Sequence, residues 1–174
     1  MDSQAWYVVL IAAVVVERVA ELVVSKRNAS WALKQGGVET GRAHYPPMVL
    51  LHSGLLAACV IEVLVADRPF FPALGWPMLA LVLAAQALRW WCITTLGRRW
   101  NTRIVVIPGL PLVMAGPYRR LRHPNYVAVV VEGIALPLVH CAWITAVTFT
   151  VLNAVLLLRF RIPAEERALE SAAA

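Results

Sequence analysis

The apolar residues of this chain fall into long unbroken runs instead of the short alternating patterns that are typical of soluble proteins. Residues 5–24 form the first run, residues 47–66 the second and residues 72–96 the third. Each run has at least about 20 residues, which is the length that an α-helix needs to cross the hydrocarbon core of a bilayer. The pattern therefore predicts three membrane-spanning helices in the first hundred residues.

A fourth apolar block, from Val127 to Arg159, is too long for a single span. Near its middle lie three residues that suit a tight turn, Pro137, His140 and Cys141. We therefore predict a helical hairpin with spans over residues 124–140 and 142–160. The predicted fold class is all-α: one integral membrane bundle of about five transmembrane helices, with a cytoplasmic loop and a short C-terminal helix.

Composition supports a membrane protein. Of the 174 residues, 60% are hydrophobic and 15% are charged, whereas about 25% are charged in an ordinary soluble domain. A soluble protein of this size cannot bury so much apolar surface, so we expect the excess to face lipid. The N-terminus lacks the basic segment of a signal peptide, and the first apolar run is therefore expected to remain as a helix.

Basic residues separate the two ends of the predicted bundle. The net charge is +6, and 13 of the 16 Lys and Arg residues lie in residues 25–46, residues 97–126 and the tail from Arg159 onward. A five-span topology puts these segments on one side and leaves only Arg68 on the other. Because basic segments stay in the cytoplasm, the N-terminus is predicted to lie outside and the C-terminus inside. This topology explains the charge better than nucleic-acid binding does.

The segment between the third and fourth predicted spans carries the most candidate chemistry. Prolines and glycines break residues 97–126 into turns, and the apolar side chains between them favour a loop that folds over a site. His123 precedes Pro124, a pair that predicts the start of the fourth helix. The free N–H groups of a helix start can hold an anionic group of a ligand. A plain helix start, with its basic residues on lipid headgroups, is an equal alternative.

The C-terminal tail contains a second candidate motif. Pro163 is expected to break the last span and to start a short helix with Glu165 and Glu166 in its first turn. One interpretation is a capped, solvated helix, because negative charge is favourable at a helix start. The other is a ligand site in which Glu165 binds a cationic or hydroxyl-bearing group and Arg161 binds an anion.

Several ionisable residues fall inside the predicted spans. Glu17, Arg18 and Glu21 lie in the first span, where pairing with one another and facing a substrate are equally good interpretations. Glu132 lies two turns into the fourth span and needs a partner, for which Arg89 or a ligand would serve. The three cysteines have no metal-ligand spacing and are expected to be buried free thiols: Cys59, Cys92 and Cys141. His44 and His52 are expected to be core or interfacial histidines.

Two motifs together resemble the isoprenylcysteine carboxyl methyltransferase family of integral membrane methyltransferases. They are GPYRRLRHPNY, ending at Tyr126, and RIPAEERAL, starting at Arg161. The resemblance covers residues 89–169. The run LGRRWNTRIVV, starting at Leu96, further resembles a small bacterial subgroup often found with type III polyketide synthases. The resemblance thus implies a prokaryotic plasma membrane protein with its active site on the cytoplasmic side.

The resemblance also implies a cofactor and its site. The cofactor would be S-adenosylmethionine, bound on the cytoplasmic side, and no metal is implied. Arg161 would orient the methyl acceptor. The residues that would line or bind the cofactor are Leu112, Val113, Tyr118, His123, Pro124, Asn125, Tyr126 and Glu165.

The expected function is transfer of a methyl group to an acidic oxygen of a lipophilic acceptor dissolved in the membrane. An alkylpyrone or alkylresorcinol is favoured, because the longer N-terminal part of the eukaryotic members is missing; prenylcysteine or another lipid acid is the alternative. An anionic acceptor needs only Arg161, whereas a phenol needs a base, for which Glu166, Glu132 and His123 are candidates. A small transporter or a membrane scaffold are the rival classes. A transporter would show polar residues along several spans, and a scaffold would not need the long loop.

Overall fold

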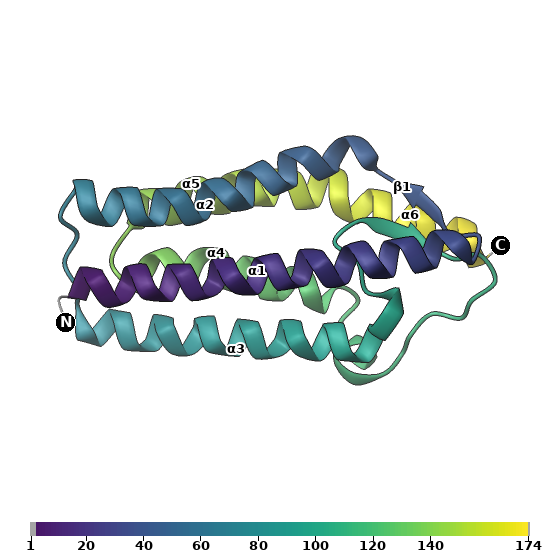
Figure 1. The fold of residues 1–174 in the computed structure, drawn as a ribbon, viewed down its shortest axis with the longest axis horizontal. Coiled ribbons are helices and arrows are strands. Elements are labelled where there is room, and N and C mark those ends of the chain that lie inside the picture. Colours follow the sequence, from purple (N-terminus) through teal and green to yellow (C-terminus); the bar gives the residue numbers. More distant parts are fainter. Residues whose placement is uncertain (1–2, 174) are drawn as a thin grey trace.

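The computed structural model describes residues 3–173, and most of them are helical. The long helices are α1 (Ser3–Lys34), α2 (Tyr45–Val65), α3 (Pro72–Leu96), α4 (Pro124–Leu138) and α5 (Trp143–Leu156). They run along one common axis, with α1 and α2 in front of α4 and α5 (Figure 1). α4 packs against α3 and α5, and α2 packs against α1 and α5. The all-α class predicted from the sequence is confirmed.

Three helices of the described part are long and apolar enough to cross a membrane. They cover Arg42–Val65, Pro72–Arg99 and Trp143–Ala172. α4 is apolar but has only 15 residues, fewer than the about 20 that a full span needs. The chain is therefore a membrane protein, and the total of about five spans stays a prediction.

The first helix is longer than predicted. Its expected span ended at residue 24, but α1 continues to Lys34. Ser25, Ala29 and Ala32 are buried at helical spacing in this extension, so it is amphipathic. Its polar residues therefore mark the exposed face of a helix, and the basic segment that follows residue 24 begins as a continuation of α1.

The expected break at Pro163 is also wrong, because the chain stays helical there. A π-helical turn, η4 (Leu157–Arg161), joins α5 to α6 (Ile162–Ala173) without interruption. Proline has no N–H, and its ring crowds the carbonyl four residues earlier. We attribute the wider turn before Pro163 to this crowding. As a result, Arg161 and Glu165 lie on one continuous helical segment.

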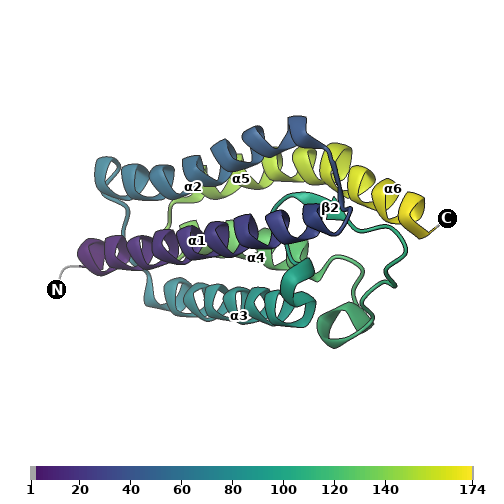
Figure 2. The ribbon, with the colours of Figure 1, turned by 45° about the vertical axis from the view of Figure 1, so that its right-hand side comes forward.

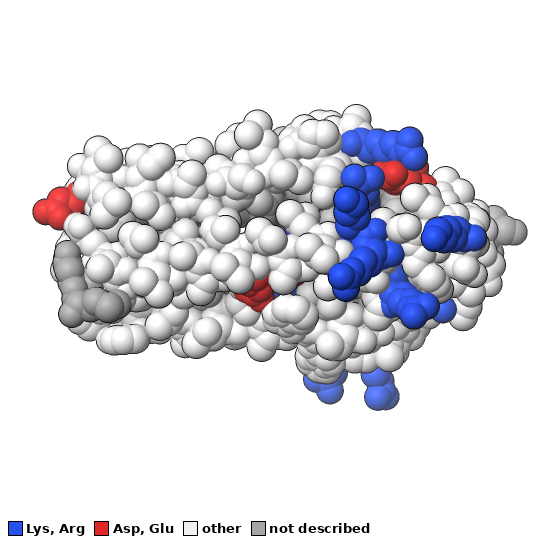
Figure 3. All heavy atoms as spheres, viewed as in Figure 1, with Lys and Arg blue, Asp and Glu red and all other residues white. Residues whose placement is uncertain are grey.

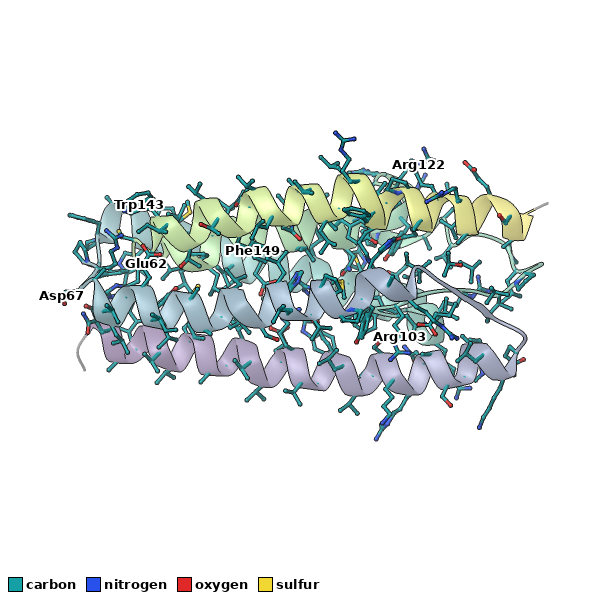
Figure 4. The ribbon with its side chains drawn as sticks, turned by 90° about the horizontal axis from the view of Figure 1, so that it is seen from above. Glu62, Asp67, Arg103, Arg122, Trp143 and Phe149 are labelled. Atoms are coloured by element: carbon teal, nitrogen blue, oxygen red, sulfur yellow. The ribbon has the colours of Figure 1, made fainter. Side chains whose placement is uncertain are left out.

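The helical hairpin of α4 and α5 is confirmed, with its turn at residues 139–142. Cys141 takes a left-handed conformation there, with φ of 55°. At the start of α5, just after this turn, Glu62 of α2 accepts hydrogen bonds from the backbone N–H groups of Ile144 (3.2 Å) and Thr145 (2.7 Å). Figure 4 shows Glu62 near Trp143 at this end of the molecule. Glu62 thus caps the start of α5 and ties α2 to α5.

Gly133 lets α4 approach α5 closely. A Cβ atom at Gly133 would lie 2.1 Å from a ring carbon of Phe149, far inside van der Waals contact. We expect Gly133→Ala to lower the free energy of unfolding by about 1–3 kcal/mol, because the ring must leave its place. Thermal unfolding in detergent measures this, with Gly54→Ala as the control, since a Cβ at Gly54 meets no atom within 4 Å. Equal unfolding temperatures for the two variants would contradict the packing.

The opposite end of the bundle carries the loops and the basic residues. Strand β1 (Val38–Thr40) pairs antiparallel with β2 (Ile104–Val106). Three short 3-10 turns lie in the same region: η1 (Arg42–His44), η2 (Gly97–Arg99) and η3 (Gly116–Arg119). Figure 2 shows these loops at the same end of the bundle as α6, and Figure 3 shows Lys and Arg side chains gathered at this end. The uneven distribution of charge read from the sequence is thus present in the fold.

Candidate active site

The first turns of α4 and α6 meet at the basic end and bring two distant motifs together. Tyr126 donates a hydrogen bond from its hydroxyl to Oε2 of Glu165 (2.5 Å). The two ring nitrogens of His123 lie 3.5 Å from Oε1 of Glu165 and 3.4 Å from Oε1 of Glu166. The imidazole thus bridges both carboxylates. Residues about forty positions apart in the sequence form one polar cluster.

Local structure fixes the side chains of α4 in this cluster. His123 is the N-cap residue, with a φ of −130° and a ψ of 60°, and Pro124 occupies the first turn of the helix. The ring of His123 stacks on that of Tyr126, with centroids 5.5 Å apart. The start of α4 also faces the Glu165 carboxylate, and the positive end of the helix dipole favours negative charge there.

The two carboxylates should keep His123 protonated to higher pH. The contact of its ring with the Glu165 carboxylate is the largest cause that raises the pKa of His123 above its ordinary value of 6.5. The pKa of His123 is therefore higher in the folded than in the unfolded protein. The stability that this residue contributes to the fold is complete below the unfolded pKa and is lost as pH rises through the folded pKa. We expect NMR of labelled histidine to show His123 titrating above 6.5, and Glu165→Gln to move the titration down. Titration at or below 6.5 in the unmodified protein would contradict the bridge.

Arg161 is buried, and only part of its hydrogen-bonding capacity is used. It is 4% exposed, and Nη2 donates a hydrogen bond to the backbone carbonyl of Thr102 (2.8 Å). Among the described residues, Nε and Nη1 of Arg161 have no hydrogen-bond partner. A buried guanidinium with free N–H groups is suited to hold an anionic oxygen.

Thr102 positions Arg161 and was missed in the sequence analysis. Its backbone N–H donates to Oγ of Ser25 (2.9 Å), and its own Oγ1 is 2.8 Å from the same atom. These bonds therefore tie the loop to the extension of α1 at Thr102, the residue whose backbone carbonyl holds Arg161. The only signal in the sequence was the position of Thr102 inside the run LGRRWNTRIVV.

Glu132 belongs to a different cluster, inside the helical bundle. Its carboxylate binds Arg89, the partner expected from the sequence, and also Nη2 of Arg18 (3.2 Å). Arg18 also pairs with Glu21 (2.5 Å), and Gln86 binds Glu17. These charged groups therefore pair with one another between α1, α3 and α4. None of the described contacts joins Glu132 to Arg161 or Glu165, and its role as a base stays a prediction.

The remaining predicted residues lie in the loop before α4 and at the start of α4, and they make no hydrogen bond or ion pair with the cluster among the described residues. Leu112 is 56% exposed and Val113 is half-buried, both in the loop between β2 and η3. Asn125 is half-buried, and its Oδ1 has no partner among the described residues. Burial raises the pKa of Tyr118 in η3 above its ordinary value, so its hydroxyl stays protonated and can donate. Their contacts with a cofactor stay predictions.

Comparison with known proteins agrees with the two motifs. Residues 78–171 match the sequence model of the isoprenylcysteine carboxyl methyltransferase (ICMT) family, a stretch that contains all the residues predicted for the site. An uncharacterized protein of Bacillus subtilis (strain 168), YpbQ, is 40% identical over 162 residues, which are 92% of this chain and 95% of that protein. The bacterial polyketide-associated subgroup stays a prediction. The chain belongs to the isoprenylcysteine carboxyl methyltransferase family, and is thus a membrane protein of a methyltransferase family.

Proposed function

We propose that this protein transfers a methyl group from S-adenosylmethionine to an acidic oxygen of a lipophilic acceptor at the membrane surface. The observation that carries the proposal is the meeting of His123 and Tyr126 with Glu165 and Glu166, beside the buried Arg161. Anionic and cationic groups lie next to one another there, as a site for a cationic donor and an anionic acceptor requires.

The residues present fit such a cofactor. When bound, it supplies a methyl group on a positively charged sulfur. Glu165 would bind the cofactor with its carboxylate, which Tyr126 and His123 hold in place. Asn125 offers a buried side-chain oxygen without a partner among the described residues. Leu112 and Val113 would cover the site from the loop.

Arg161 is the residue that we assign to the acceptor. Its free N–H groups would hold an oxyanion in a fixed orientation, since the Thr102 carbonyl already fixes the guanidinium. A carboxylate or an acidic enol is ionised at neutral pH and needs no base. For a phenol, the Glu166 carboxylate is the base that we favour, because it lies in the same cluster as His123, whose raised pKa favours the protonated imidazole that cannot itself accept a proton.

The acceptor is best identified by a paired assay. An alkylpyrone or alkylresorcinol and a farnesylcysteine analogue are offered to the same purified protein with methyl-labelled cofactor. We expect the polyketide-type acceptors to be methylated with the higher kcat/KM. Preference for farnesylcysteine, which the family name suggests, would reverse this ranking and leave the methyl transfer itself in place.

The site is proposed to face the cytoplasm, with the N-terminus outside. Figure 1 shows the two chain ends at opposite ends of the bundle, and Figure 3 shows the basic residues at the C-terminal end. In a variant without native cysteines, an impermeant thiol reagent on intact cells should label Ser3→Cys and spare Ser171→Cys. Labelling of both from outside, or of Ser171→Cys alone, would overturn this topology.

A further inference from the structure

The loop between β2 and α4 is held against the end of α3. A Cβ atom at Gly116, in η3, would lie 2.5 Å from Oγ1 of Thr95 and 3.0 Å from Nε1 of Trp91, both on α3, so the two segments touch. Arg99, at the end of η2, donates a hydrogen bond from Nη1 to the backbone carbonyl of Pro111 (2.7 Å). The stretch between these two points is therefore fixed at both ends.

This position is level with the membrane surface. α3 belongs to a helix that is long and apolar enough to cross a membrane, Pro72–Arg99, and Thr95 lies in its last two turns. Trp90 and Trp91, just before, are 40% and 55% exposed, and exposed tryptophans are typical of the depth at which a span meets the lipid headgroups. The loop therefore lies beside the boundary between lipid tails and headgroups.

The outer face of this loop is apolar and basic. We call residues 110–122 the surface loop. Its large exposed apolar residues are Leu110, Leu112, Met114 and Leu121. Its arginines are Arg119, Arg120 and Arg122, which are all exposed. Figure 4 shows Arg122 at the edge of the basic end. The surface loop contains no Asp or Glu, so its own charge is entirely positive.

These properties fit a lipid surface that carries negative charge. Exposed apolar side chains with basic residues beside them are typical of segments that lie in the boundary region of a bilayer. The apolar side chains would enter the outer part of the lipid tails, and the arginines would bond the phosphate groups of anionic lipids. We propose that the surface loop binds anionic lipid and that this contact holds the loop over the candidate active site.

The contact with lipid would thereby affect the cofactor. The surface loop contains Leu112, Val113 and Tyr118, which are predicted to line the cofactor site, and it leads directly into His123. A contact that favours one position of the loop raises the apparent affinity for any ligand that needs this position. Anionic lipid should therefore strengthen the binding of S-adenosylmethionine, an effect that rests on the proposed function.

The first test measures the lipid contact alone, by the accessibility of spin labels in nanodiscs of phosphatidylglycerol. One label is attached at Met114→Cys and one at Glu170→Cys, on an exposed position of α6. Cys141→Gly removes the native cysteine that is not buried. We expect oxygen to reach the Met114→Cys label and a water-soluble nickel complex not to reach it, whereas the nickel complex should reach the Glu170→Cys label.

Two results would overturn this contact. Access of the nickel complex to the Met114→Cys label would place the surface loop in water. A label that is shielded from both reagents would show that protein, and not lipid, covers the loop.

The second test measures the cofactor. Calorimetry gives the Kd of S-adenosylmethionine in nanodiscs of neutral phosphatidylcholine and of anionic phosphatidylglycerol. An anionic bilayer also concentrates this cationic cofactor, but it does so for every variant, so the ratio of the two Kd values is compared between variants. We expect the ratio to fall about fivefold or more in the double variant Arg119→Gln with Arg120→Gln, because one basic residue near an anionic surface contributes about this factor.

The matched control is the double variant Lys26→Gln with Arg27→Gln, which removes two exposed positive charges just beyond the first predicted span. Its ratio should equal that of the unmodified protein. An equal fall in both double variants would show a general effect of surface charge and would overturn the role of the surface loop.

The lipid contact and the proposed function fail in different ways. Cofactor binding with an unchanged ratio in Arg119→Gln with Arg120→Gln would overturn the effect of lipid on the site and leave the proposed function. A Met114→Cys label in lipid, on a protein that binds no cofactor in either kind of nanodisc, would overturn the proposed function and leave the lipid contact.

Discussion

Glu165→Gln is expected to weaken binding of S-adenosylmethionine by about ten- to hundredfold, the usual effect of losing a charged hydrogen-bond partner. The variant keeps the shape of the side chain and removes its charge. It also removes the negative charge that Tyr126 and His123 contact, whereas the contact of His123 with Glu166 on α6 remains. Calorimetry on the detergent-purified protein measures the affinity.

Glu170→Gln is the matched control for this variant, because Glu170 is exposed on the same helix. Lys34→Ala, at the end of α1, is a second control for the loss of a surface charge. Both should bind the cofactor as the unmodified protein does. An unchanged affinity in Glu165→Gln would show that the cluster at the start of α4 and α6 is structural only.

Arg161→Lys is expected to lower kcat by about a hundredfold, the range seen when one positioned donor to a reacting oxygen is lost. The ammonium group of lysine replaces the planar guanidinium, whose several N–H groups point in fixed directions. The lysine can therefore no longer both donate to the Thr102 carbonyl and orient an oxyanion. Cofactor affinity should stay within about threefold, since the acceptor and the cofactor use different groups.

The control is Arg159→Lys, because Arg159 lies in the same π-helical turn and is exposed. Its kcat should be unchanged. If Arg161→Lys retains full turnover, Arg161 serves the structure and not the acceptor. A loss of cofactor binding in Arg161→Lys would instead assign Arg161 to the cofactor.

The sequence predicted the elements that depend on local patterns. The hairpin at residues 139–142 follows from the length of one apolar block and from Pro137, and the start of α4 follows from Pro124. The extension of α1 was missed, because a polar amphipathic helix lacks the continuous apolar run by which a span is identified. The π-helical turn before Pro163 was missed because proline predicts a break unless the backbone can widen locally.

The site was predictable to the extent that two motifs resemble one family. The convergence of His123 and Glu165 depends on the packing of α4 against α5, which no local pattern specifies. Thr102 holds Arg161 through its backbone carbonyl. Every residue has this group, so the residue type gives no sign of the interaction. The pairing of β1 with β2, more than sixty residues apart, is likewise invisible to local periodicity.

Methyl transfer into a lipid is tested most directly by following the methyl group. The purified protein in lipid nanodiscs is incubated with methyl-labelled S-adenosylmethionine and a lipid extract, and the organic phase is then separated and counted. We expect label in the lipid phase with the unmodified protein and with Glu170→Gln, and at least tenfold less label with Glu165→Gln at subsaturating cofactor. Label that stays in the aqueous phase with extracts containing lipid acids, alkylpyrones, alkylresorcinols and prenylcysteines would contradict it.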